Sequence, residues 1–386
     1  MTAAMMWIRS HVRRDWRALT LIALSIGIAG GFAMTAAIGA SRCSSSWQQL
    51  LERTNMPDAA QEVLTTESGA AVEALRVRAG VATAARISFM PIGMSGSDAP
   101  FGGFTGRDPG IGTDIYRPLV IRGRAADPAR ADEFTINPAA AAATGLEPGD
   151  QVTLTSYPDA VHQTATMVGI IVGPLDIGLN GDSPLVWLTP AFGATWFDAF
   201  VNALPAHDRD TYRDVVLAKT TSTATTAQLL SEGYISSTGF AGNQVAAALD
   251  ALGALYTVLT AVGALGTAIV IGQLIGRRVR RRGDDSATLA ALGLTPTRRR
   301  VALAGSHVGA AIIGVGLVPV VAYLASPLVG RGLIDKVDPR GHHVTDVSLL
   351  AIGCLLALIV LPGAAFVAAW RMDGRRIDQS TRNPGR

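Results

Sequence analysis

Residues 18–40 read ALTLIALSIGIAGGFAMTAAIGA, and none of these side chains carries a charge. A helix of roughly 20 apolar residues crosses the hydrocarbon core of a bilayer, so this stretch predicts a transmembrane helix. Three further uncharged apolar stretches of at least this length follow, at Ala251–Gly276, Val301–Gly330 and Val347–Trp370. The chain therefore predicts four spans, one before and three after a long polar region.

The polar region between the first and second spans has the length of one folded domain, about 210 residues. Its pattern mixes helical stretches with short alternating stretches that predict strands. The strands are expected at 119–121, 133–136, 152–155 and 166–172. We predict an α-helical membrane protein with four transmembrane helices (1+3), plus an extracytoplasmic α+β domain containing a β-rich subdomain.

The predicted segments follow one another without a gap. They are an amphipathic cytoplasmic helix at 1–17, the first span at 18–40, the extracytoplasmic domain at 41–245 with its β-rich insert at about 82–190, the second span at 246–276, a cytoplasmic loop with a short helix at 277–300, the third span at 301–330, an outer loop at 331–346, the fourth span at 347–370 and a cytoplasmic tail at 371–386.

Charge predicts the orientation of the chain. The segments 1–17, 277–300 and 371–386 together hold 17 arginines against five aspartates, whereas the domain at 41–245 holds 13 basic and 21 acidic residues. Basic flanks stay on the cytoplasmic side of a membrane. We therefore expect a multi-pass protein of the inner or plasma membrane, with both termini in the cytoplasm and the large domain outside. Short basic flanks against a membrane favour anionic lipid as their partner, and we expect no nucleic-acid binding.

The first span is rich in small residues, among them Gly27, Gly30 and Gly31. Small residues let two helices approach closely inside a membrane. The pattern predicts a tight helix–helix contact, either within the chain or with a second copy.

Sequence motifs for enzyme chemistry are missing from the chain. It contains no GxxxxGK[ST] phosphate-binding loop, no HExxH, no GxSxG and no paired-cysteine metal site. Its two cysteines, Cys43 and Cys354, cannot form a disulfide framework in the domain. We expect no catalytic, cofactor or metal site, and we expect no enzyme activity in this chain.

Two ionisable residues lie near or within the spans. Asp250 is expected to cap the second span at the outer interface. His307 lies in the third span, where an ionisable side chain is a functional candidate; the alternative is a neutral histidine satisfied by the backbone or by lipid headgroups.

The segment 283–300 separates the second and third spans on the inner side. An acidic residue at Asp284 or Asp285 suits a helix N-terminus, and Gly293 suits the C-terminal cap. We expect a short helix parallel to the membrane, with Leu289 and Leu292 on one face. Such a helix can dock a cytoplasmic partner; the alternative is a plain linker.

This segment resembles the cytoplasmic signature of FtsX-like permeases, the MacB/LolC class of ABC transporters, in which an acidic residue leads into a leucine-rich helix that ends in Ala-Leu-Gly before basic residues. Ala290 stands where arginine is usual in the class. The resemblance implies an ATPase-coupling helix formed by Asp285, Leu289, Ala291, Leu292 and Gly293, with a basic inner flank at Arg298, Arg299 and Arg300.

Other parts of the chain also resemble this family. The matching runs are Gly39–Arg42, which resembles actinobacterial members, and, in the outer domain, Arg122–Arg124, Asp132–Glu133, Gly145–Asp150 and Val168–Ile170. With the one-plus-three topology, the resemblance covers nearly the whole chain. It indicates a single-module member of the type VII ABC superfamily.

The resemblance implies a permease subunit that passes ATP-driven motion to its outer domain, for export or extraction of an envelope substrate. The implied partners are a cytoplasmic ABC ATPase dimer that binds the ATP and Mg, a second permease copy or sister subunit, the lipid bilayer, and an extracytoplasmic lipoprotein or enzyme. The alternative function is a regulatory membrane protein that controls an envelope enzyme, such as a cell-wall hydrolase, without transport.

Overall fold

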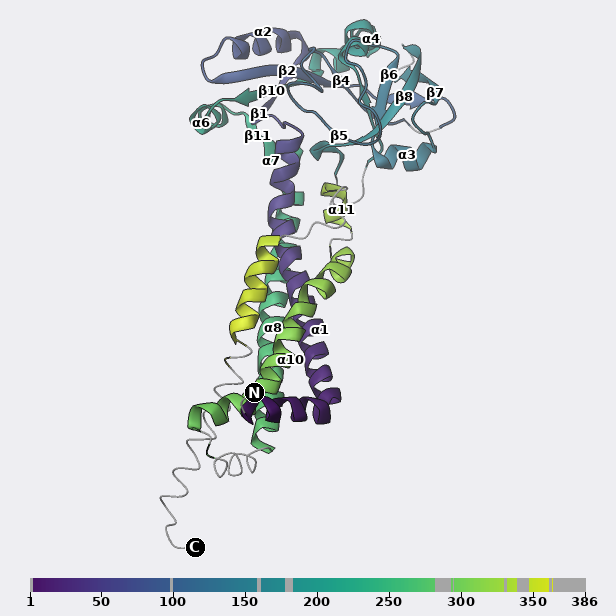
Figure 1. The fold of residues 1–386 in the computed structure, drawn as a ribbon. Coiled ribbons are helices and arrows are strands. Elements are labelled where there is room, and N and C mark those ends of the chain that lie inside the picture. Colours follow the sequence, from purple (N-terminus) through teal and green to yellow (C-terminus); the bar gives the residue numbers. More distant parts are fainter. Residues whose placement is uncertain are drawn as a thin grey trace. The chain divides into compact units, whose positions relative to one another are not determined.

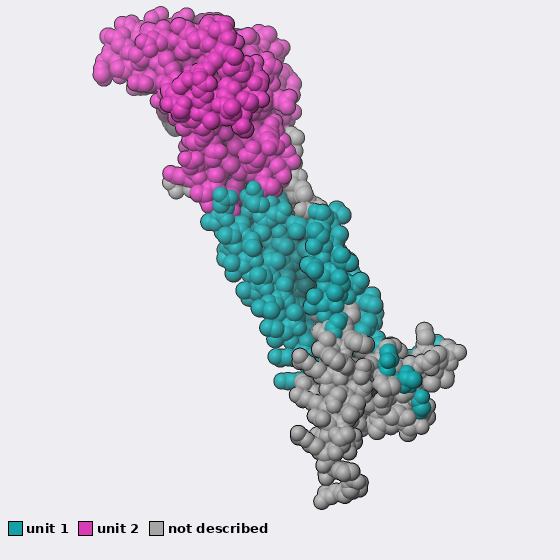
Figure 2. All heavy atoms as spheres, turned by 90° about the vertical axis from the view of Figure 1, so that its left-hand side faces the viewer, with its two compact units in different colours: residues 1–44, 250–335, 340–386 teal, residues 45–249, 336–339 magenta. Residues whose placement is uncertain are grey.

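The computed structural model describes residues 3–97, 100–157, 161–177, 183–281, 293, 295–329, 332–338, 347–360 and 363. The chain forms two compact units (Figure 2). Unit 1 comprises Met1–Ser44, Asp250–Asp335 and Arg340–Arg386, and unit 2 comprises Ser45–Leu249 and Lys336–Pro339. The chain passes from unit 1 to unit 2 inside the long helix α1 (Ala3–Arg53) and returns to unit 1 inside the long helix α8 (Asn243–Arg281).

Unit 1 is built from apolar helices. Three described helices have segments long and apolar enough to cross a membrane, at Val12–Arg53, Asn243–Leu274 and His307–Leu328. The last of these lies in α10 (Pro296–Ala325) and the 3-10 turn η2 (Ser326–Leu328). A shorter apolar helix spans Val347–Val360. The predicted fourth span begins with this helix, and most of its second half lies outside the described residues.

Helix α1 is longer than the predicted first span. It contains one residue with non-helical dihedrals, Asp15 (φ −110°, ψ 18°), which lies near the end of the predicted amphipathic segment 1–17. At its other end the helix continues through Ser44 to Arg53. Ser41, Arg42 and Ser44–Ser46 lower the hydropathy after Ala40 while the backbone stays helical, so the apolar run stops before the helix does.

Glycines on α1 bring its backbone close to α10. A Cβ added at Gly27 would lie 2.6 Å from Cβ of Leu317, and one added at Gly31 would lie 2.5 Å from Cβ of Val321. On the facing helix, a Cβ at Gly314 would lie 2.9 Å from a carbonyl oxygen of α1. The predicted close contact is therefore confirmed within the chain, because no larger residue fits at these positions.

The described strands of unit 2 form one mixed sheet in the order β11-β1-β10-β2-β4-β9-β6-β8-β7-β3, with β5 pairing with β8 (Figure 1). Their bounds are β1 Ala59–Leu64, β2 Val81–Phe89, β3 Ile92–Met94, β4 Gly102–Gly106, β5 Leu119–Gly123, β6 Glu133–Ile136, β7 Gln151–Ser156, β8 His162–Val172, β9 Leu185–Leu188, β10 Arg213–Thr220 and β11 Ile235–Ser236. The helices of the unit are α2 Thr65–Arg76, α3 Pro138–Thr144, α4 Pro190–Ala203, α5 Ala206–Thr211, α6 Thr223–Ser231 and α7 Ser237–Ala241, with the 3-10 turn η1 Pro174–Asp176; α11 (Leu333–Val337) spans the boundary between the units.

The base of unit 2 consists of antiparallel β1, β10 and β2, packed against α2 and α6. Side chains on a strand alternate between faces. Val216 and Ala218 of β10 pack with residues of α2 and α6, whereas Leu217 between them packs in a second cluster with Ile111 and Ile115. The base is therefore buried on both faces.

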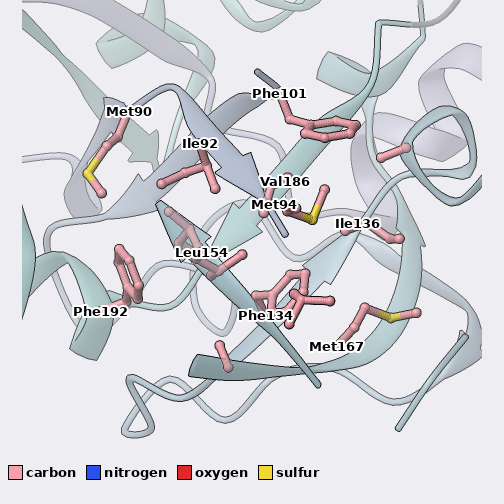
Figure 3. Close-up of a cluster of buried hydrophobic side chains, with 14 of the residues drawn as sticks. Met90, Ile92, Met94, Phe101, Phe134, Ile136, Leu154, Met167, Val186 and Phe192 are labelled. Carbon is pink, nitrogen blue, oxygen red and sulfur yellow. The ribbon is translucent and has the colours of Figure 1, made fainter. Parts of the chain in front are cut away.

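The β-rich part of unit 2 surrounds a separate core. Phe134 and Ile136 of β6, Met167 of β8 and Val186 of β9 lie at its centre, all fully buried (Figure 3). The strands β4 and β9, and β6 and β8, are parallel pairs. The insert was predicted to begin at about 82, but β2 pairs with both β10 and β4, so this strand joins the base to the β-rich part.

The Gly31 contact generates the first prediction. Gly31→Leu forces α1 and α10 apart and lowers stability by about 1–3 kcal/mol, the usual cost of overpacking. The measurement is the thermal unfolding midpoint of the full chain in detergent. Gly266→Leu on α8 is the matched control, because a Cβ there meets nothing within 4 Å. Equal midpoints for the two variants would contradict the packing.

Candidate functional site

The predicted coupling segment is only partly described. Asp285, Leu289, Ala291 and Leu292 lie outside the described residues. Gly293 is described, and its φ of 77° is the left-handed conformation that glycine adopts just past the end of a helix.

The basic flank of this segment lies on α10. This helix begins at Pro296, with Thr295 at its N-cap, so Arg298–Arg300 lie in its first turns and not in a loop before 301. Proline at the first helical position suits a helix start, because its missing N–H is one that no helix carbonyl accepts.

Asp250 and His307 differ from each other in their surroundings. Asp250 was predicted to cap a helix, and this is wrong: it is exposed inside α8, which begins at Asn243. The residues before Asp250, Asn243–Leu249, are also helical, and they belong to unit 2. His307 is fully buried within α10.

The four runs of unit 2 that resemble the permease family lie close together and contact one another. The Glu133 carboxylate, 2 % exposed, accepts two hydrogen bonds of 2.7 Å from the Arg124 guanidinium and lies 3.0 Å from Nη1 of Arg130. The backbone N–H of Asp127 also donates to it, at 3.1 Å. The hydrogen bonds from Arg124, larger in effect than burial, hold the pKa of Glu133 below its ordinary value.

The glycines of these runs allow strands β5 and β8 to touch. Gly123 has φ 74° and pairs with Gly169, and a Cβ on either would collide with a backbone carbonyl of the other strand or its extension. Arg122 pairs with Glu147 at 2.9 Å, and the N–H of Gly149 donates to the Met167 carbonyl at 2.7 Å. These runs therefore build the architecture of the β-rich part.

A second buried polar cluster lies in the base and was not predicted. The Asp214 carboxylate is fully buried and accepts hydrogen bonds from the hydroxyls of Ser68 at 2.6 Å, Ser88 at 2.7 Å and Thr65 at 3.2 Å. Because the hydroxyls donate to the carboxylate and no histidine takes part among the described residues, the arrangement fits structural satisfaction of a buried charge.

Next to it, Asp108 is held by two arginines. Arg86 Nε lies 3.0 Å from its Oδ2, and Arg76 Nη2 lies 2.9 Å from its Oδ1. Burial alone would raise the pKa of the Asp108 carboxyl, but the hydrogen bonds from Arg86 and Arg76 outweigh it, and the pKa lies below its ordinary value. No group of three metal-ligating side chains occurs among the described residues.

Each unit contains a pocket that sequence analysis did not find. In unit 1, a pocket of about 360 Å³ lies among α1, α8 and the helix Val347–Val360, with almost entirely apolar walls. In unit 2, a pocket of about 240 Å³ is lined by Tyr116 and Trp187, whose rings stack at 4.7 Å, and by Arg117. The second pocket forms from segments far apart in sequence, which is why no local signal marks it.

No protein-family model matches the chain, and no curated protein matches it. Solved structures similar to part of it include the extracellular domain of the noncanonic ABC-type transporter YknZ from Gram-positive bacteria, at 14% identity and TM-score 0.30, covering 45% of this chain and 92% of that one. A domain of a putative permease protein from Porphyromonas gingivalis has 16% identity and TM-score 0.30, covering 46% and 82%. The periplasmic region of MacB from Actinobacillus actinomycetemcomitans has 7% identity and TM-score 0.31, covering 49% and 93%.

The Glu133 cluster generates a pH-dependent prediction. Because the folded pKa is depressed, the stabilisation is complete above the ordinary glutamate pKa and is lost as pH falls through the folded pKa. Glu133→Gln should lower the free energy of unfolding by about 1–2 kcal/mol at pH 7. This figure is discounted for solvent screening, because Arg124 and Arg130 are half exposed. It corresponds to a fall of about 2–8 °C in the unfolding midpoint.

Thermal unfolding of the full chain between pH 7 and pH 3 measures this effect. The gap between wild type and Glu133→Gln should close as the pH falls. Glu62→Gln, on an exposed residue of β1, is the control and should stay within about 0.5 kcal/mol of wild type. A gap that stays constant with pH would show that the Glu133 charge is not what stabilises the fold.

Proposed function

We propose that this chain is the permease subunit of an ABC transporter of the MacB/FtsX type, placed in the inner or plasma membrane with both termini in the cytoplasm and unit 2 outside. A separate cytoplasmic ATPase dimer hydrolyses ATP and docks on the segment 285–293. Its motion reaches unit 2 and acts there on an envelope substrate or partner.

The observation that carries the proposal is the continuity of α1 and α8. After Asp15, α1 runs as one helix from unit 1 into unit 2, and α8 runs from unit 2 into unit 1, so the backbone is helical at both crossings. A helical connection acts as a semi-rigid spacer, whereas a Gly/Ser-rich loop behaves as a flexible coil. Two such connections support a membrane part that moves an outer domain.

The position of the inner arginines supports a cytoplasmic contact. Arg298–Arg300 lie in the first turns of α10, where the positive end of the helix dipole disfavours cations. The interaction with the helix dipole therefore does not stabilise α10 through these arginines. A role towards anionic lipid headgroups or an acidic surface of the ATPase accounts for their presence.

Close packing between α1 and α10 supports transmission across the membrane. A push on the N-terminal end of α10 passes to α1 through Gly27–Leu317 and Gly31–Val321, which leave no free space between the helices. Packed interfaces of this kind shift as units and do not deform smoothly. In this proposal α10 receives the motion and α1 carries it outward.

A charge on the docking face tests the proposal. Leu292→Asp should abolish recovery of an ABC ATPase in a mild-detergent pull-down of the tagged native protein, and with it the co-purified ATPase activity, because an apolar contact is replaced by a buried charge. Ala287→Asp is the matched control, since a helix over 286–292 places residue 287 opposite Leu289 and Leu292.

Two results would contradict the proposal. One is normal ATPase recovery with a well-expressed Leu292→Asp variant. The other is recovery from wild type of an envelope enzyme, such as a cell-wall hydrolase, with no ATPase, which would favour the regulatory alternative.

A further inference from the structure

The pocket of unit 2 has aromatic and aliphatic walls. Trp187 stacks with Tyr116 at 4.7 Å and with Phe104 at 4.9 Å, so the aromatic wall is rigid. The remaining wall residues come from the segments 111–118 and 125–128, from β6, β8 and β9, and from the start of α4. Three prolines among them, Pro118, Pro128 and Pro190, further limit movement.

Arg117 carries the charge of this pocket. It is the one charged residue among the described residues that line the pocket, and it is exposed. Its backbone N–H donates to the Thr54 carbonyl at 2.6 Å, but its guanidinium has no hydrogen bond or ion pair within the described part of the chain. An unpaired arginine at an apolar pocket favours a planar anion, which its fork of donors can bind with two hydrogen bonds.

Thr135 is one of three threonines that line the pocket, and each of them carries a hydroxyl. Two other threonines of the wall already use theirs: Thr189 donates to the Arg130 carbonyl at 2.7 Å, and Thr113 donates to the Gly110 carbonyl at 3.3 Å. Thr135 is only 4 % exposed and lines the pocket. A hydroxyl at the pocket wall can form a hydrogen bond with a ligand oxygen.

The backbone at this pocket is strained. Tyr116 has φ 52°, a conformation that costs a bulky residue about 1–3 kcal/mol and that is kept mainly where a site needs it. Its N–H donates to the Asn55 carbonyl at 3.0 Å, so residues 54 and 55, directly after α1, hold the strained segment in place. Tyr116 stacks on Trp187 in this conformation, and the next residue, Arg117, is exposed.

We propose that this pocket binds a small carboxylate with an apolar or aromatic body. The body lies against Trp187 and Tyr116, and the carboxylate pairs with Arg117. A cation is disfavoured by the same arginine, and a sugar would need more free hydrogen-bonding groups than the wall offers. The site does not depend on the function proposed above, since it uses residues of unit 2 alone.

The test uses the full chain in nanodiscs and 3-phenylpropanoate as the probe. Calorimetry should give saturable binding that empty nanodiscs lack. The neutral 3-phenylpropanamide should bind about 5- to 10-fold more weakly, because it cannot pair with the guanidinium. Hydrogen exchange should slow in segments 111–118 and 125–128 with the acid bound, while β1 and β10 stay unchanged.

Three variants locate the site. Arg117→Gln should weaken binding of the acid about 5- to 10-fold and leave binding of the amide unchanged. Ala126→Phe, on a half-exposed wall residue, should fill the pocket and abolish binding of both. Arg209→Gln removes an exposed charge of α5 and should bind as wild type does.

Absence of saturable binding would overturn the proposal. So would acid binding that is unaffected by Ala126→Phe in a variant with wild-type thermal stability. Equal affinities of wild type for acid and amide would overturn the assignment of Arg117 to a carboxylate.

Discussion

The close approach of α1 and α10 is the contact on which unit 1 depends. Apolar helices gain no hydrophobic energy from each other inside a lipid, so they are held by close packing and dispersion. Gly27 and Gly31 remove the side chains that would keep the backbones apart, and Leu317 and Val321 fill the space. The larger apolar residues Leu19, Ile22 and Ile26 extend this contact towards the helix start.

Unit 2 differs from unit 1 because it buries charged side chains. Glu133, Asp108 and Asp214 are nearly inaccessible, and each carboxylate is met by arginines or hydroxyls. Removing one partner leaves a buried charge uncompensated and destabilises the fold, so these groups constrain the structure around them. The pocket that we propose as a binding site has none of these three carboxylates among its lining residues.

Local patterns predicted much of the fold. The strand at 133–136 and the apolar helices follow from residue period and hydropathy. Hydropathy placed the end of the first span at Ala40, because it measures apolarity and not helicity, whereas α1 runs to Arg53. Asp250 was misplaced for the same reason.

Long-range features could not be predicted. Pairing of β10 with both β1 and β2 joins residues more than a hundred positions apart, and no local pattern encodes it. The runs that resemble a permease family gave no role for their residues, whereas in the structure Glu133 and Gly123 hold unit 2 together. Tyr116 and Trp187 form the pocket wall only after the sheet is assembled.

The central claim is that an ATPase cycle in the cytoplasm changes the outer unit. Hydrogen exchange of the native complex, compared with and without a non-hydrolysable ATP analogue, tests this most directly. The account predicts altered exchange in residues 54–56 and 110–117 of unit 2, which are hydrogen-bonded to each other just past the end of α1. Altered exchange confined to the cytoplasmic segments, with unit 2 unchanged, would contradict it.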